Sequence, residues 1–326
     1  MDEFGRIARL RKRLAWTGPS ADPSTGPDVR VGIGDDAAVL APSASVQVLS
    51  VDTANEHIHF EWSFGSPAQL TQRAVVAALS DLAAMGARPR ACLMALSLAP
   101  DVDDARFDGI VDGLVAVSEA YRVPIVGGNL SGARDTAFTT TVVGECAGRT
   151  ITRTGARVGD IVYVTGPVGG SALGLAALLA GRAQDFEEFA DCWRAPRARV
   201  DLSEPLSRVA SAAIDISDGL VQDLGHLCEA SQVSATVEFE RVPLAGGLEA
   251  AAGRLGADPL DLVLAEGDVY ELLFTAPPDA VVGDWATPVG RILAQTETPV
   301  CVTVGGAPLK ASFSGFSHFR TSKQDS

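Results

Sequence analysis

Strand and helix patterns alternate along almost the whole chain, and this alternation is the feature that most restricts its fold. Short apolar runs bounded by glycine and polar residues predict strands, and longer runs with apolar residues three and four apart predict the helices between them. The alternation restarts after residue 150, where ARVGD at 156–160 is typical of a turn. We therefore predict a mixed α/β (α+β) protein with an N-terminal domain over residues 1–149 and a C-terminal α/β domain over residues 150–326.

The charge and the cysteines of the chain exclude several classes of protein. Acidic residues number 41 against 26 basic ones, which gives a net charge of −15. Non-specific binding to nucleic acid needs cations that neutralise phosphates, so we expect no nucleic-acid partner. The five cysteines lie far apart without a CxxC pair, and no apolar stretch is long enough to span a membrane. We expect a cytoplasmic protein without a disulfide framework, a zinc site or a membrane partner.

Acidic motifs stand where predicted strands or helices end. The chain has no GxxxxGK[ST], GxSxG or HExxH motif, which removes several familiar enzyme classes. Oxygen-rich acidic motifs bind Mg²⁺, and no nucleophile–base pair accompanies them, so they favour metal-dependent phosphate chemistry over acyl transfer. The motifs are GIGDD at 32–36, SVDT at 50–53, SD at 80–81, GGN at 127–129, DISDG at 215–219 and EGDVYE at 266–271.

Two of these motifs also have simpler structural explanations, whereas a third does not. The Gly-Asp pair within GIGDD is typical of a turn into a strand, and Asp52 can cap the end of the strand predicted over 46–51. Asp81 interrupts an apolar helical run, where an unpaired buried carboxylate is costly. We therefore expect a metal ion or an arginine beside Asp81.

DISDG lies where a predicted strand runs directly into a helix. Free backbone N–H groups at such a junction can bind phosphate oxygens, and Asp215 and Asp218 can hold the accompanying metal. Ser217 or Asp218 can also cap the helix, and the two roles are compatible. His57 and His59 alternate as strand residues do; such histidines are more often surface or core residues than metal ligands, although His59 could contact a substrate.

The ordered motifs together resemble the thiamine-monophosphate kinase family, whose superfamily includes aminoimidazole ribonucleotide synthetase and selenophosphate synthetase. The similarity extends from about residue 4 to residue 319. LSDLAAMGA and ISDGL with DLGHL are specific in combination, whereas GGN alone is not. The motifs that carry the resemblance are GIGDDAAVL, SVDT, HF, LSDLAAMGA, GGN, TRTGARVGD, VYVTG, AIDISDGL, DLGHL and YELLFT.

The resemblance implies a homodimer joined through the N-terminal sheets, and ATP bound with several Mg²⁺ ions. The γ-phosphoryl group would pass directly to thiamine monophosphate, giving thiamine diphosphate and ADP. Because the acceptor is already an anionic phosphate oxygen, no catalytic side chain is implied beyond the metal ligands. The implied metal ligands are Asp35, Ser50, Val51 through its carbonyl, Asp52, Asp81, Asn129, Asp215 and Asp218; the implied ATP contacts are Gly128, Asn129, Arg153 and Ser217; the implied substrate contacts are His59, Asp268 and Phe316.

The chain departs from the family pattern at three places. Asn129 replaces an aspartate, Val51 stands where threonine is common, and EGDV at 266–269 replaces GGED. Asn129 should weaken one Mg²⁺ site, because an amide oxygen carries no charge. Three hypotheses are open: a thiamine-monophosphate kinase, a related ATP-dependent kinase or synthetase acting on another phosphorylated small molecule, and a nucleotide-binding homologue without turnover.

Overall fold

The chain forms two compact units in its computed structural model, which describes residues 3–14, 29–33, 36–310, 313 and 315. The first unit comprises Met1–Thr150 and Arg194–Arg208. The second unit comprises Ile151–Trp193 and Val209–Ser326. No helix of the described part is long and apolar enough to cross a membrane.

The segment Arg194–Arg208 packs with the first unit, although it lies within the range predicted for the C-terminal domain. Its polar side chains explain the packing. Ser203 Oγ donates to the carbonyl of Ala87 at 2.8 Å, and Arg194 Nε donates to the carbonyl of Phe64 at 2.6 Å. The first unit is therefore discontinuous in sequence.

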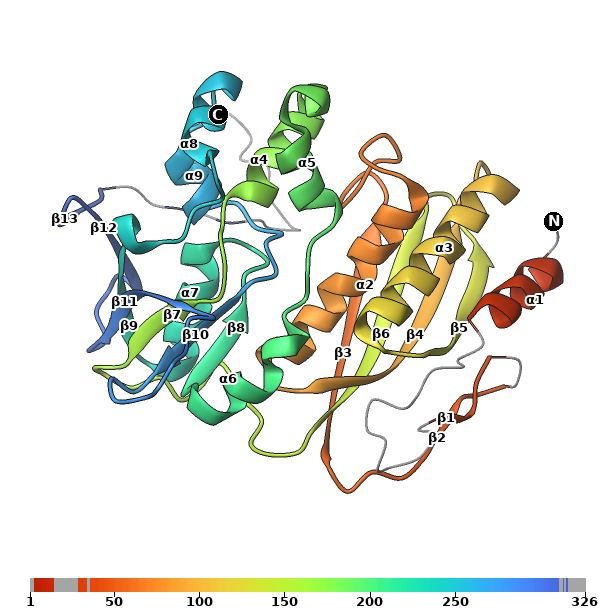
Figure 1. The fold of residues 1–326 in the computed structure, drawn as a ribbon, viewed down its shortest axis with the longest axis horizontal. Helices are drawn as coiled ribbons and strands as arrows, with labels where there is room; N and C mark the ends of the chain where they lie inside the picture. Colours follow the sequence, from red (N-terminus) through yellow and green to blue (C-terminus); the bar gives the residue numbers. More distant parts are fainter. Residues whose placement is uncertain (1–2, 15–28, 34–35, 311–312, 314, 316–326) are drawn as a thin grey trace, which may run out of the picture. The chain divides into compact units, whose positions relative to one another are not determined.

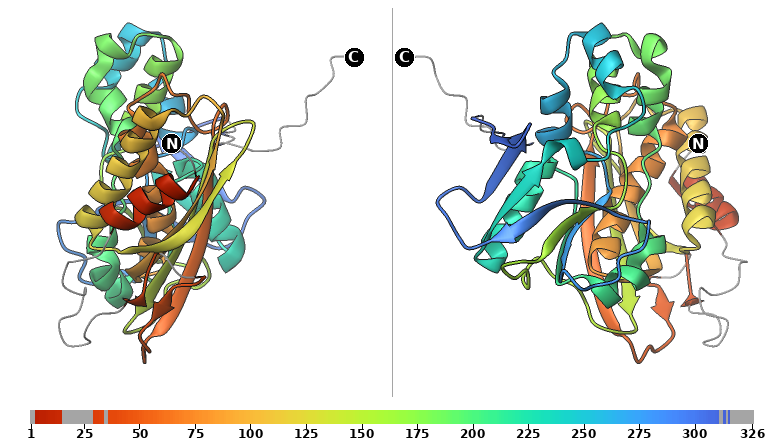
Figure 2. Two further views of the ribbon diagram at one scale, coloured as in Figure 1. Left: turned by 90° about the vertical axis from the view of Figure 1, so that its right-hand side faces the viewer. Right: turned by 60° about the vertical axis from the view of Figure 1, so that its left-hand side comes forward.

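A four-stranded sheet with helices on one face forms the centre of the first unit (Figure 1). The elements of this unit are α1 (Glu3–Arg13), β1 (Val29–Val31), β2 (Val39–Leu40), β3 (Val46–Asn55), α2 (Pro67–Ala84), β4 (Arg88–Leu98), α3 (Asp104–Tyr121), β5 (Ile125–Gly132), β6 (Ala137–Cys146), η2 (Val200–Leu202) and α6 (Ser203–Val209). The strand order is β3-β6-β4-β5, with β4 and β5 parallel and the other neighbours antiparallel. In the left view of Figure 2, α2 and α3 lie on the same side of this sheet.

Local sequence signals set the start of α2. Ser66 and Gln69 form a capping box: the Gln69 N–H donates to Ser66 Oγ at 3.3 Å, and the Ser66 N–H donates to Gln69 Oε1 at 2.9 Å. Pro67 occupies the first turn, where its missing N–H costs nothing. Leu79 and Leu82 are fully buried. Their burial holds this side of α2 against the rest of the unit, next to Asp81.

The second unit contains a seven-stranded mixed sheet in the order β13-β12-β9-β11-β7-β10-β8. Its elements are β7 (Ile161–Val164), α4 (Gly170–Leu179), η1 (Ala183–Phe186), α5 (Glu187–Arg194), β8 (Ala212–Asp215), α7 (Leu220–Ser231), β9 (Ser234–Glu238), η3 (Phe239–Arg241), α8 (Leu248–Leu255), α9 (Pro259–Leu264), β10 (Leu272–Ala276), β11 (Thr287–Leu293), β12 (Val300–Val304) and β13 (Ala307–Pro308). β9 and β12 are parallel, whereas β8 and β10 are antiparallel. α7 contacts β8, at one end of this strand order, and β12, next to the other end.

Two predicted strand ends are wrong, and both carry candidate site residues. β3 continues to Asn55 instead of ending at Val51, so Asp52 lies inside the strand and pairs with Thr140. β5 continues through Gly127 and Gly128 to Gly132 instead of ending at the paired glycines. In both cases pairing with a neighbouring strand overrides the weak local strand propensity of polar residues and glycine.

Candidate functional site

Three predicted residues of the first unit, Ser50, Asp52 and Asp81, gather where β3 faces α2. In the sheet, Ser50 pairs with Val142, and Asp52 pairs with Thr140. Paired residues point to the same face, and Thr140 Oγ1 donates to the carbonyl of Ala74 in α2. Ser50 and Asp52 therefore lie on the helix-covered face.

The Ser50 hydroxyl donates a hydrogen bond to Asp81 Oδ2. Sequence reasoning predicted a metal ion or an arginine beside Asp81, and the structure places this serine there. Asp52 Oδ1 accepts the N–H of Thr53 at 2.7 Å. The result is a half-buried group of hard oxygen atoms, the donor type that Mg²⁺ prefers.

Val51 and Asn129 lie apart from this group. The Val51 side chain is on the opposite face of the sheet and is 63% exposed, so only its backbone carbonyl is available as the predicted ligand. Asn129 lies on β5, at the other edge of the sheet, and pairs with Ala95 of β4. Three strand spacings separate β5 from β3, which is about 14 Å. Within one copy of this unit, Asn129 and Gly128 are not brought to Asp52.

His59 has one ring nitrogen committed to the backbone. The N–H of Asn55 donates to His59 Nδ1 at 2.9 Å, and a neutral imidazole with an accepting Nδ1 carries its proton on Nε2. His57 is different, because it is exposed and pairs with Glu61 at 3.1 Å. A hydrogen bond from the His57 ring to the Glu61 carboxylate, the largest cause, raises the pKa of His57. The two histidines therefore have separate roles.

The loop after β8 differs from the prediction in one important respect. Its N–H groups were expected to be free for phosphate, but the N–H groups of Ser217, Asp218 and Gly219 all donate to Asp223 Oδ2, at 3.0, 3.0 and 3.1 Å. The N-cap position of α7 is Gly219, which has no side chain, so neither predicted side chain caps the helix. A carboxylate from inside α7 satisfies these donors instead.

Three carboxylates surround this loop. Asp215 and Asp223 are 4% and 1% exposed, and Gln222 Nε2 donates to Asp218 Oδ2 at 3.1 Å. Burial is the largest cause that raises the pKa of Asp223 to about 7, and the charge of Asp215 adds to it. Clustered carboxylate charge of this kind is what a bound divalent cation offsets. The loop is therefore the candidate metal site of the second unit.

The EGDVYE segment packs directly against the same loop. The N–H of Asp268 donates to the carbonyl of Ser217 at 2.9 Å, and the N–H of Tyr270 donates to that of Ile216 at 2.9 Å. Asp268 and Tyr270 have φ values of 62° and 58°, which non-glycine residues seldom adopt. Their conformation is held by these contacts and by the hydrogen bond from Tyr270 Oη to Asp268 Oδ1 at 3.0 Å. The DISDG and EGDVYE motifs, which are about 50 residues apart in sequence, therefore contact each other.

Arg153 lies on an exposed loop that the far end of α7 holds. Ser231 Oγ donates to the carbonyl of Arg153 at 2.8 Å. It also accepts the N–H groups of Gly155 and Ala156 at 3.1 and 3.2 Å. The loop backbone is therefore ordered while the Arg153 side chain remains exposed.

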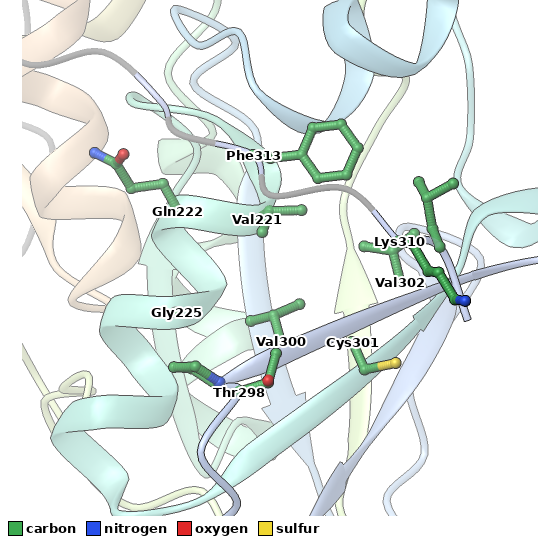
Figure 3. A pocket seen from close by; sticks show the side chains of 11 residues that line it. Val221, Gln222, Gly225, Thr298, Val300, Cys301, Val302, Lys310 and Phe313 are labelled. Carbon is green, nitrogen blue, oxygen red and sulfur yellow. The ribbon is translucent and has the colours of Figure 1, made fainter.

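A cavity of about 700 Å³ is lined by residues of α7 and β12 and by Leu309, Lys310 and Phe313 (Figure 3). Its wall is mostly apolar, with Val221, Val300, Val302 and Phe313 among the lining residues. Gln222 also borders the cavity, although its amide group reaches Asp218. Among the residues that the structure describes, none of those predicted from the sequence as site residues lines it.

Two predicted site residues, Asp35 and Phe316, lie outside the described residues. Within the described part, no group of three or more His, Cys, Asp and Glu side chains is arranged to hold a metal ion by itself. Sequence reasoning missed Asp223, Gln222 and Ser231. The DLGHL motif contains Asp223 and was noted for the family resemblance, but the sequence alone assigned no role to this aspartate.

Two family models match the chain: AIR synthase related protein, N-terminal domain, over residues 34–147, and AIR synthase related protein, C-terminal domain, over residues 157–295. Hydrogenase maturation protein HypE in complex with ATP shares this fold, with a TM-score of 0.72 at 18% identity over 98% of this chain and 96% of that chain.

Relatives with higher identity belong to one group. Thiamine-monophosphate kinase of Escherichia coli (strain K12) is 34% identical over 98% of both chains, and that of Bacillus subtilis (strain 168) is 29% identical over 98% of this chain and all of the relative. The structure of AaThiL complexed with AMPPCP and TMP is 29% identical, covers 97% of both chains and has a TM-score of 0.77. The chain belongs to the thiamine-monophosphate kinase family, within the AIR synthase related proteins.

Proposed function

We propose that this protein is an ATP-dependent kinase that converts thiamine monophosphate and ATP into thiamine diphosphate and ADP. The observation that carries the proposal is 34% identity over 98% of both chains to a thiamine-monophosphate kinase. The likeness to a complex with AMPPCP and TMP, at a TM-score of 0.77, supports the same two substrates. We place the reaction in the cytoplasm, as expected for an enzyme that consumes ATP.

Both acidic groups suit Mg²⁺. Each offers carboxylate oxygens together with a neutral polar partner, Ser50 in the first unit and Gln222 in the second. Mg²⁺ prefers such oxygen ligands, and when bound it neutralises phosphate charge. The proposed metal ligands are Asp35, Ser50, Val51 through its carbonyl, Asp52, Asp81, Asn129, Asp215 and Asp218.

The remaining proposed residues bind and orient the substrates. Gly128, Asn129, Arg153 and Ser217 contact ATP. His59, Asp268 and Phe316 contact thiamine monophosphate. The proton on His59 Nε2 makes this atom a hydrogen-bond donor, as a phosphate oxygen requires. Asp268 supplies a negative charge for the cationic part of the acceptor.

We further propose that the protein is a homodimer through the sheet of the first unit. Leu49 and Val51 lie on the face opposite α2 and are 65% and 63% exposed. Exposed apolar residues gathered on one sheet face favour a protein partner. Sedimentation of the wild type and of Leu49→Lys tests this proposal: the variant should sediment as a monomer, whereas a monomeric wild type would contradict it.

The enzymatic proposal is tested by incubating the protein with MgATP and thiamine monophosphate and measuring thiamine diphosphate and ADP by chromatography. We expect both products in equal amounts, and none when Mg²⁺ is chelated. Unphosphorylated thiamine is the control acceptor, because it lacks the accepting phosphate. ADP formed only with another phosphorylated acceptor would indicate a different substrate, and bound ATP without turnover would indicate a binding protein.

A further inference from the structure

The hydrogen bonds of Asp223 go to residues that precede α7. A helix cap satisfies N–H groups inside the first turn, at the second or third helical residue. Asp223 Oδ2 instead accepts the N–H groups of Ser217, Asp218 and Gly219, and the first residue of α7 is Leu220. This carboxylate therefore fixes the shape of the loop more than it caps the helix.

The carbonyl of Ser217 in this loop is held by a second segment, the one that contains Gly267 and Asp268. The Asp268 N–H donates to the carbonyl of Ser217, and a Cβ on Gly267 would lie 1.9 Å from the same oxygen. Gln222, one residue before Asp223, donates to the side chain of Asp218. One turn of α7 thus holds both the backbone and the carboxylate of Asp218.

The last residue of the same helix repeats this arrangement at a second loop. Ser231 makes three hydrogen bonds to the backbone of Arg153, Gly155 and Ala156. Asp223 and Ser231 are eight residues apart, which corresponds to about 12 Å along a helix. A rigid helix therefore sets the spacing of the two loops.

We propose that Asp223 and Ser231 are positioning residues through which α7 holds the Ser217–Gly219 and Arg153–Ala156 loops in the conformation that receives ATP. This proposal rests on the proposed function for the identity of the ligand. The loop geometry itself does not depend on that function. Neither residue touches the reacting atoms; each acts through the backbone of residues that do.

The first test is amide hydrogen exchange of the ligand-free protein, read by mass spectrometry. Asp223→Ala removes the acceptor, so the peptide that covers Ser217–Gly219 should exchange at least about tenfold faster. Asp223→Asn keeps a carbonyl oxygen as acceptor and should stay close to the wild type. Ser231→Ala should release only the amides of Gly155 and Ala156, and Ser231→Thr should restore them.

The second test is calorimetric binding of a non-hydrolysable ATP analogue with Mg²⁺. Loss of a residue that orients ligands typically weakens binding 10- to 100-fold. We expect this loss for Asp223→Ala and Ser231→Ala, with KM for thiamine monophosphate unchanged. Ser231 is only half-buried, whereas Asp223 is fully buried, so Ser231→Ala keeps the proposal testable if Asp223→Ala does not fold.

The outcomes separate the two proposals. Unchanged exchange in Ser231→Ala and in a folded Asp223→Ala, or unchanged analogue affinity despite faster exchange, would overturn the positioning roles. If exchange and analogue affinity change as expected but the wild type forms no thiamine diphosphate, the positioning roles stand. In that case the proposed function fails.

Discussion

The Ser50–Asp81 group of the first unit and the Ser217–Gly219 loop of the second both contain proposed metal ligands, but different contacts hold these residues in place. In the first, side chains project from regular elements, and strand register places them: Ser50 and Asp52 face α2 because they alternate with Val51. In the second, an irregular backbone is held by a buried carboxylate and by a neighbouring segment. We expect the first arrangement to tolerate substitution better, because the second depends on close contacts of the backbone itself.

Both regions contain negatively charged proposed metal ligands, and removing one of these charges should have the largest effect. Asp218→Asn removes a proposed metal-ligand charge, and we expect kcat to fall at least about 1,000-fold, since metal ions supply several kcal/mol of charge stabilisation. The unfolding midpoint should hardly change. Asp279→Asn, at an exposed position of the same unit, is the control and should leave kcat unchanged. Wild-type turnover in Asp218→Asn would remove Asp218 from the proposed ligands.

The backbone contact of the second region gives the next largest effect. In Gly267→Ala the new Cβ would lie 1.9 Å from the carbonyl oxygen of Ser217, so backbone must move. We expect the free energy of unfolding to fall by about 3 kcal/mol. Gly253→Ala in α8 is the matched control, because nothing lies within 4 Å of its Cβ; it should stabilise by up to about 1 kcal/mol. Equal effects of the two substitutions on denaturant unfolding would contradict the close approach of Gly267 to the Ser217 carbonyl.

A change in the first region should cost less. Ser50→Ala removes the hydroxyl that donates to Asp81, and hydrogen bonds to charged groups contribute about 1.5 kcal/mol. Ser50→Thr retains a hydroxyl and suits a strand, so it should recover most of this loss in urea titrations. A Ser50→Ala penalty as large as that of Gly267→Ala would show that the first region is no more tolerant than the second.

The smallest effect is expected at His57, outside both regions. Its pKa is raised in the folded state, so the pair with Glu61 stabilises the fold below the unfolded pKa, and this contribution is lost as pH rises through the folded value. His57→Gln should therefore lower the unfolding midpoint slightly at about pH 5.5 and leave it unchanged at about pH 9. Glu61→Gln should reproduce this pattern; a larger loss at the higher pH would reverse the sign and refute it.

The residue types of the candidate site were predictable because the ability of a side chain to bind a metal ion or a phosphate follows from its residue type alone. Ser50, Asp52 and Asp81 were singled out from the sequence, and the structure brings all three to the α2 side of β3. DISDG and EGDVYE were also singled out, and they meet through the Ser217–Asp268 backbone contact. Carboxylates next to glycine or serine at element ends are unusual enough to be seen without a structure.

The alternating elements, the two-domain α/β architecture and the acidic residue set could be predicted from the chain alone, because hydrophobic periodicity and capping signals act over a few residues. Three features emerged only from the folded structure: β3 and β5 extend past their predicted ends, Asn129 lies at the far edge of its sheet, and Asp223 occupies the N–H groups expected to be free. The strand extensions and the place of Asn129 depend on pairing between segments distant in sequence, and the Asp223 contacts depend on how the preceding loop folds over the start of α7. The polar groups in such contacts pair with each other, so neither segment shows a periodic pattern from which the contact could be predicted.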